Sequence, residues 1–173
     1  PGDGHLCTEA LNISYDHLFP FLKWARPYTS INEAEKIARN FRARYLTNQD
    51  YALAVLDNDE MVWLGSSGYH LRDGGLENLS AEIGMWIRKD AAGQGLGTHL
   101  LCDLLGWGFT DWPWERLVWH CNERNMPSRR TAEKAGMVLE GRLRAQSRQP
   151  DGSRDDMLCF SALRTELQDP RST

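Results

Sequence analysis

Three glycines at alternate positions, Gly93, Gly95 and Gly97, constrain the fold of this chain more than any other feature. They stand in the segment DAAGQGLGTH (90–99), between the alternating apolar segment AEIGMWI (81–87) and an apolar run that begins LLCDLLGW. Alternation of apolar and other residues, as in 81–87, is typical of a strand, and the apolar run after the glycines is typical of a helix. The glycines are therefore expected in a strand-to-helix turn. One glycine is enough for a tight turn. Three of them favour a backbone that approaches a ligand closely.

A strand, a glycine-rich turn and a helix N-terminus together make an anion site. The first turn of a helix has unpaired N–H groups, and the helix dipole adds partial positive charge there, so phosphate is the usual ligand. The loop is not a Walker loop, because no Gly-Lys-Ser/Thr ends it. Its Gly-x-Gly-x-Gly spacing also differs from the Gly-x-Gly-x-x-Gly of dinucleotide-binding folds.

The length and composition indicate a single globular domain. The chain has 173 residues, of which 41% are hydrophobic and 25% are charged, and these values are ordinary for soluble domains. A net charge of -4 argues against a protein that coats nucleic acid. No apolar run reaches membrane-spanning length, and no signal peptide is expected.

The four cysteines are well separated and form no CxxC motif, so we expect free thiols in a reducing cytoplasm. His120 and Cys121 are adjacent, but neighbouring strand residues point to opposite faces, so no metal site is expected.

Strands and helices are mixed along the chain. Helical spacing covers 8–23, with an interruption near Pro20, and 31–46. Ser30 with Glu33 forms a capping-box pattern before the second helix. A Pro-Asp-Gly turn at 149–153 joins the last two strands. Further helices are expected at 96–109 and 127–135, and strands at 51–57, 61–71, 77–87, 115–122, 140–148 and 156–163. This order predicts an α/β (α+β) domain with a mixed sheet.

The loop AGQGLGTH resembles the pyrophosphate loop of the GNAT acyltransferases, whose pattern is Arg/Gln-x-x-Gly-x-Gly/Ala. Gly95 and Gly97 fill the two small positions, whereas Ala92 stands where Arg or Gln is usual. The segment CNERNMPSRRTAEKAGMVLEGRLR resembles the RimJ/RimL-type branch, the ribosomal-protein N-acetyltransferases and their relatives. The matching positions in it are Asn125, Ser128, Lys134, Gly136, Glu140 and Gly141, with Met137 in place of an aromatic residue.

The resemblance covers the chain from about residue 8 onward and implies one GNAT domain over 1–173. It implies a single mixed, mostly antiparallel, twisted sheet, flanked by helices, with a V-shaped splay between two central parallel strands. The branch begins with one further strand, which is either missing here or upstream of residue 1. Acetyl-CoA is then the co-substrate, and no metal is expected.

By the same resemblance, the pantetheine arm pairs with the strand at Met85, Trp86 and Ile87. The pyrophosphate is held by the loop residues Gly93, Gln94, Gly95, Leu96, Gly97 and Thr98. Asn125 bonds to the pantetheine, and Ser128 lies near the thioester sulfur and protonates the leaving thiolate. Asn and Ser also suit helix capping, and the two roles are compatible.

The segment 124–148 contains seven basic residues and only two acidic residues, Glu133 and Glu140. A solvated surface is the favoured interpretation. The functional alternatives are contact of Arg129 or Arg130 with the CoA 3′-phosphate and docking of an acidic acceptor.

The implied reaction is attack of a neutral primary amine on the thioester. An α-amino group has a pKa of about 7.7–8.0, against about 10.4 for the lysine side chain. It loses its proton more readily, so a weaker general base is sufficient for it than for lysine. Glu82 is the candidate base, with an ordinary strand-edge charge as the alternative. The acceptor is a protein N-terminus or a small molecule such as a polyamine, an amino acid or an amine antibiotic. Another acyl-CoA as the donor, and a non-catalytic CoA-binding module, remain open. We expect no membrane or nucleic-acid partner, while Trp107, Trp112 and Trp114 belong to the core or to a homodimer surface.

Overall fold

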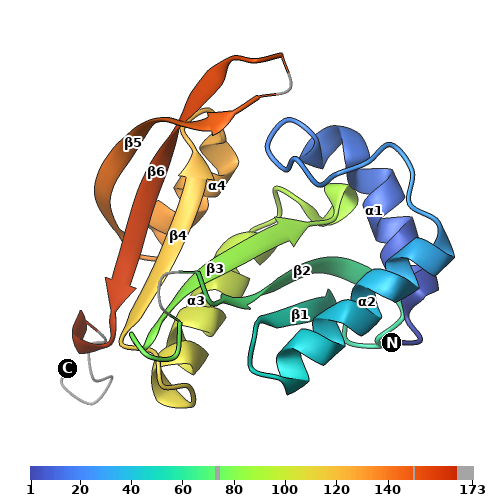
Figure 1. Ribbon diagram of the computed structural model, residues 1–173, viewed down its shortest axis with the longest axis horizontal. Helices are drawn as coiled ribbons and strands as arrows, with labels where there is room; N and C mark the ends of the chain where they lie inside the picture. Colours follow the sequence, from blue (N-terminus) through green and yellow to red (C-terminus); the bar gives the residue numbers. More distant parts are fainter. Residues whose placement is uncertain (73–74, 150, 167–173) are drawn as a thin grey trace. The chain divides into compact units, whose positions relative to one another are not determined.

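The computed structural model describes residues 1–72, 75–149 and 151–166 (Figure 1). Its helices are α1 (Gly4–Leu18), α2 (Ile31–Leu46), α3 (Leu96–Thr110) and α4 (Met126–Lys134), with short 3-10 helices η1 (Lys89–Ala91) and η2 (Arg164–Glu166). Its strands are β1 (Tyr51–Leu56), β2 (Trp63–His70), β3 (Ser80–Ile87), β4 (Arg116–Asn122), β5 (Val138–Arg148) and β6 (Arg154–Leu163). Each predicted helix and strand is present. The first helix begins at Gly4, earlier than predicted, and ends at Leu18, close to the predicted interruption near Pro20. Pro150 of the predicted turn lies outside the described residues.

The six strands form one mixed sheet with the order β1-β2-β3-β4-β6-β5. β1 with β2, β4 with β6, and β5 with β6 are antiparallel, and β3 with β4 is parallel. The predicted fold class is therefore confirmed. The parallel pairing joins Ser80–Glu82 to Arg116–Val118, which are the first residues of both strands.

The chain divides into two compact units. Unit 1 contains residues 1–70 and 85–97, and unit 2 contains residues 71–84 and 98–173. The chain crosses between the units three times, and at two of these crossings, within β3 and within α3, it does so inside regular structure.

In unit 1, α1 and α2 pack on each other and on the hairpin of β1 and β2 (Figure 1). Four buried residues form the centre of this packing: Cys7, Ala10, Ala34 and Trp63. The small residues let the two helices approach each other closely, and the indole fills the space beneath them. The predicted capping box is confirmed, since the Ser30 Oγ accepts the Glu33 N–H and the Glu33 carboxylate accepts the Ser30 N–H.

In unit 2, α3 buries one apolar stripe, which contains Leu101, Leu104, Leu105 and Phe109. Arg164 stabilises the end of this helix, because its guanidinium donates to the carbonyl oxygens of Phe109, Trp112 and Trp114 at 2.6–2.9 Å.

The tryptophans that follow α3 stack on one another. Trp107 meets Trp112 edge-on, and Trp112 stacks on Trp114. Trp114 is fully buried, whereas Trp107 is 41% exposed. Core packing therefore accounts for Trp114 but not for Trp107.

Candidate active site

The glycine loop has the geometry that the sequence predicts. β3 ends at Ile87, η1 follows, and α3 begins at Leu96. Gly93 and Gly95 have φ values of +77° and +89°, which other residues adopt only with strain. Gly97 lies in the first turn of α3, where its N–H is one of the unpaired helical donors. The Gln94 amide donates to the Asp90 carbonyl at 2.8 Å and closes the loop on itself.

The start of this loop is anchored to α1 through Arg88. The Arg88 side chain is only 10% exposed, and it donates to the carboxylates of Glu9 and Asp90, each at 2.8 Å. The next residue, Lys89, donates its backbone N–H to the buried Ser14 hydroxyl at 3.1 Å. A buried guanidinium with two carboxylate partners fixes the position from which the glycine turn departs.

The last three residues of β3, Met85, Trp86 and Ile87, are half-buried. One edge of this segment is covered by β2, since a Cβ at Gly65 would lie 2.2 Å from the Trp86 carbonyl oxygen. The Arg88 N–H donates to the Leu64 carbonyl at 2.7 Å and continues the same contact. A ligand that pairs with this segment must therefore use its other edge.

Asn125 and Ser128 lie together at the start of α4. Asn125 is the N-cap residue, and its Oδ1 accepts the Ser128 N–H at 3.2 Å, so the capping role is confirmed. The Ser128 hydroxyl accepts the Trp119 indole N–H at 3.2 Å and is hydrogen-bonded to the Cys121 thiol. Burial raises the pKa of that thiol to about 11, against a smaller opposing effect of the Ser128 contact, so Cys121 is a poor nucleophile.

Glu82 is held by two partners. Its Oε1 accepts from Arg72 at 2.8 Å, and its Oε2 lies 3.1 Å from the His120 Nδ1. The carboxylate is only 11% exposed, and the imidazole is 22% exposed. The sequence suggested His120 only as a metal ligand, and it did not indicate a role for Arg72. The alternation along β3 and β4 was the available signal, because it places Ser80, Glu82, Val118 and His120 on one face once the two strands are aligned.

Ser128 and Glu82 lie on opposite faces of β4. Trp119, which binds Ser128, and His120, which binds Glu82, are consecutive strand residues and point to opposite sides. The two predicted catalytic side chains are therefore separated by the plane of the sheet. A single ligand could contact both side chains only if it extended across that plane.

A hollow of about 280 Å³ opens on the Glu82 face of unit 2. Its lining residues are Asn78, Ser80, Arg116, Val118, His120 and Cys159. The Arg116 guanidinium donates to both Glu140 oxygens, at 2.7 and 2.5 Å, and the Ser161 hydroxyl donates to the same carboxylate at 2.7 Å. The Arg116 and Ser161 hydrogen bonds lower the pKa of Glu140 from 4.5 to about 2.

This shift predicts an acid-labile contribution to stability. Because the Glu140 pKa is lower in the folded state, its contribution is complete above pH 4.5 and is lost as the pH falls toward 2. The side chain is 39% exposed, so solvent screening reduces the effect to about 1 kcal/mol. Glu140→Gln should be less stable than the wild type at pH 6, and the two should converge near pH 2 in urea unfolding. The exposed Glu77→Gln is the control, and a difference that does not change with pH would contradict the assignment.

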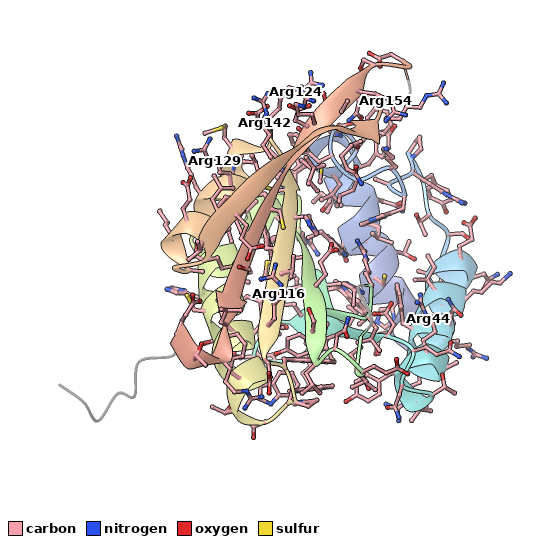
Figure 2. All side chains as sticks on the ribbon, turned by 60° about the vertical axis from the view of Figure 1, so that its left-hand side comes forward. Arg44, Arg116, Arg124, Arg129, Arg142 and Arg154 are labelled. Atoms are coloured by element: carbon pink, nitrogen blue, oxygen red, sulfur yellow. The ribbon has the colours of Figure 1, made fainter. Side chains whose placement is uncertain are left out.

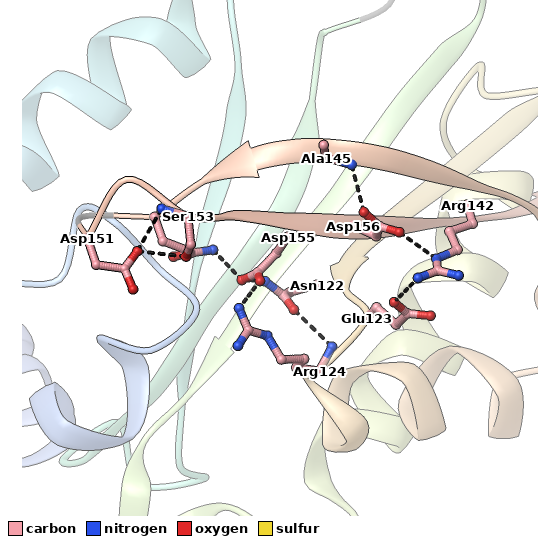
Figure 3. Close-up of polar contacts among 10 residues, drawn as sticks. Asn122, Glu123, Arg124, Arg142, Ala145, Asp151, Ser153, Asp155 and Asp156 are labelled. Carbon is pink, nitrogen blue, oxygen red and sulfur yellow. Dashed lines mark hydrogen bonds and ion pairs between the residues drawn. The ribbon is translucent and has the colours of Figure 1, made fainter.

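The basic segment that follows β4 is largely paired. Figure 2 shows Arg124, Arg129 and Arg142 at one end of unit 2, away from Arg116. Arg124 pairs with Asp155, and Arg142 pairs with Glu123 and Asp156 (Figure 3).

Arg129 pairs with Glu133 at 2.8 Å, within α4. Two of the carboxylate partners, Asp155 and Asp156, come from β6, outside the sequence window in which the basic residues were counted. The expected basic face is therefore partly neutralised.

Within residues 1–72, 75–149 and 151–166, no cluster of His, Cys, Asp and Glu has the arrangement of a metal site. No helix in the same residues is long and apolar enough to cross a membrane.

Comparison with known proteins agrees with the geometry. The family model described as "Acetyltransferase (GNAT) domain" matches residues 5–138 of this chain. The chain is 30% identical to YdaF of Bacillus subtilis strain 168, named as a ribosomal N-acetyltransferase, over 97% of this chain and 90% of that protein.

Two solved structures have the same fold. One is the microcin C7 self-immunity acetyltransferase MccE in complex with acetyl-CoA and AMP, with a TM-score of 0.80, 18% identity and coverage of 93% of this chain and 87% of the other. The other is the spermidine N-acetyltransferase of Vibrio cholerae with CoA and spermine, with a TM-score of 0.75, 20% identity and coverage of 95% and 91%. The turn at Gly93 and Gly95, which leads directly into the N-terminus of α3, fits the diphosphate of CoA. The chain belongs to the GNAT family of acetyltransferases, and its co-substrate is acetyl-CoA.

Proposed function

We propose that this enzyme acetylates the α-amino group at the N-terminus of a peptide or protein. The observation that carries the proposal is the placement of Ser128 and the Glu82–His120 pair on opposite faces of β4. A thioester in the plane of the sheet would have a proton donor for its sulfur on one side. It would have proton acceptors for the attacking amine on the other side.

Residues of β3 and of the glycine loop would bind the donor. The free edge of Met85, Trp86 and Ile87 would pair with the pantetheine arm, as an added strand. The backbone N–H groups of the glycine loop and the first turn of α3 would hold the diphosphate. These are the N–H groups of Gly93, Gln94, Gly95, Leu96, Gly97 and Thr98. Since β3 and α3 pass through both units, we propose that residues 1–173 act as one catalytic domain.

Three residues of α4 and its cap would also bind the donor: Asn125, Ser128 and Arg129. The Asn125 Oδ1 is used in capping, which leaves its Nδ2 to donate to a pantetheine carbonyl. Arg129 uses its Nε in the pair with Glu133, and its remaining N–H groups would reach the 3′-phosphate. The Ser128 hydroxyl would protonate the departing thiolate.

The α-amine is preferred to a lysine side chain because it is substantially neutral near pH 7.5 and needs less help from a base. The second candidate acceptor is a small-molecule amine. The fold that this chain shares with a spermidine acetyltransferase is consistent with such an acceptor. A homodimer that uses the exposed Trp107 is a further part of the proposal, and light scattering would test it.

The decisive experiment is the release of CoA thiol from acetyl-CoA, with and without peptides or small amines. Peptides with a free N-terminus should stimulate release in the wild type. Ser128→Ala should lower kcat by about 100-fold, without weakening CoA binding. Thr131→Val removes a hydroxyl from the same helix and should leave kcat unchanged.

Stimulation by small amines alone would favour the second candidate. Tight CoA binding without release in the presence of any amine would leave the non-catalytic module as the better description.

A further inference from the structure

We propose that the hollow on the Glu82 face of unit 2 is the acceptor site, that His120 takes the proton of the amine, and that Glu82 orients His120. The inference rests on the proposed function and assigns residues to its acceptor half. It also favours an acceptor with a single amine and neutral polar neighbours over a polyamine.

The contacts of Glu82 make it a positioning residue and not the base itself. Both of its oxygens are engaged, one by Arg72 at 2.8 Å and one by His120 at 3.1 Å. His120 lines the hollow, whereas Glu82 lies behind it at 11% exposure. The imidazole is therefore the proton-accepting group that a molecule in the hollow would meet.

The Glu82 contact also selects the tautomer of His120. A carboxylate can only accept, so the Nδ1 of His120 carries the hydrogen that is shared with Glu82. The Nε2 then holds a lone pair and can accept a proton. A carboxylate that orients an imidazole in this way also stabilises the imidazolium that forms, as in other His–carboxylate pairs.

The step balances without any further reagent. The amine nitrogen forms a C–N bond to the thioester carbonyl carbon, and its proton passes to the His120 Nε2. The C–S bond breaks, and the thiolate takes a proton from the Ser128 hydroxyl. His120 then gives its proton to solvent, and Ser128 regains one from solvent.

The charges around the hollow define the acceptor class. Two ion pairs lie beside His120 or its neighbours. Arg72 is paired with Glu82, and Arg116 is paired with Glu140. Among the six lining residues, the one formal charge is the positive charge of Arg116. A polyamine carries additional ammonium groups that need carboxylates, and both carboxylates beside the hollow, Glu82 and Glu140, already have arginine partners.

A peptide N-terminus suits this lining better than a polyamine does. Its reacting amine is followed by uncharged amide groups, which can exchange hydrogen bonds with polar side chains. Asn78 and Ser80 supply such side chains at the wall of the hollow.

His120→Gln tests the base role, with the exposed His17→Gln as its control. The acceptors are glycinamide and aminoacetonitrile, which are similar in size but differ in basicity. For glycinamide at pH 7, kcat/KM should fall by about 100-fold. The loss should be smaller for the weakly basic aminoacetonitrile, and it should shrink for glycinamide as the pH rises.

An equal loss for both amines at every pH would show a structural role and overturn the assignment. Glu82→Gln should show the same dependence on amine basicity, with a smaller loss than His120→Gln. If Glu82→Gln were impaired while His120→Gln kept wild-type rates, Glu82 itself would be the base.

Cys159 offers a test of occupancy that needs no turnover. It lines the hollow, whereas the exposed Cys102 on α3 serves as an internal control in the same molecule. Glycinamide or a short peptide should slow alkylation of Cys159 and leave Cys102 unaffected, whereas spermidine at equal concentration should not slow it.

Protection by spermidine would overturn the charge argument. The lack of protection by any amine, in an enzyme that still turns over peptides, would place the acceptor elsewhere and leave the proposed function standing. Failure of the proposed function itself would appear as a wild type without amine-stimulated thiol release.

Discussion

Gly68→Ala should lower the free energy of unfolding by about 3 kcal/mol, through backbone strain and overpacking together. Gly68 is buried in β2, opposite Ala52 of β1, with a φ of +145°. A Cβ there would lie 2.1 Å from the Tyr51 carbonyl oxygen and 3.0 Å from the Ala52 Cα. Both contacts are with backbone, so neither can be relieved by a side-chain rotation. The hairpin that supports α1 and α2 would have to open.

Thermal unfolding measures this effect, and a midpoint lower by roughly 10 °C is expected for a chain of this size. Gly106→Ala on α3 is the matched control, because its Cβ meets nothing within 4 Å. That change should be neutral, or stabilise the helix by about 0.5–1 kcal/mol. Equal midpoints for the two variants would mean that β1 and β2 do not approach each other as closely as the structure shows.

Leu96→Pro should weaken CoA binding while α3 remains folded. Leu96 is the first residue of α3, a position where proline is well tolerated because its N–H has no partner inside the helix. In the proposed site, that N–H is one of the donors to the diphosphate. A hydrogen bond to a charged group contributes about 1.5–3 kcal/mol, so the Kd for CoA should rise by roughly 10- to 100-fold.

Leu96→Ala is the matched control, since it shortens the same side chain but keeps the N–H. Calorimetric titration with CoA should give a much weaker Kd for the proline variant than for the alanine variant. The apo proteins should unfold at similar temperatures. Equal affinities would show that this N–H does not bind the diphosphate, and equal losses would assign the effect to the leucine side chain.

The local features of the fold and of the site were predictable because they depend on residues close in sequence. The capping box at Ser30 and Glu33, and the cap at Asn125, involve groups within one helical turn of each other. The backbone at Gly93 and Gly95 likewise follows from the strand before the loop and the helix after it.

The partners of charged side chains were less predictable. Arg124 and Arg142 suggest a basic face when their own segment is read alone. In the fold, β6 runs beside β4 and β5, and it brings Asp155 and Asp156 to these arginines (Figure 3). The antiparallel register of β6 with β4 and β5 determines these ion pairs. A count of the charges within one segment of the sequence does not contain that information.

The sequence by itself determined the order of helices and strands, the glycine turn before α3 and the family to which the chain belongs. Hydrophobic periodicity, capping and turn chemistry act over a few residues, and the motif spacing is local as well. Only the tertiary structure decided that Glu82 meets His120, 38 residues away, and that Ser128 lies on the other side of β4. The physical reason is the parallel register of β3 and β4, which pairs Glu82 with Val118 and so brings His120, on the same face, within reach of Glu82.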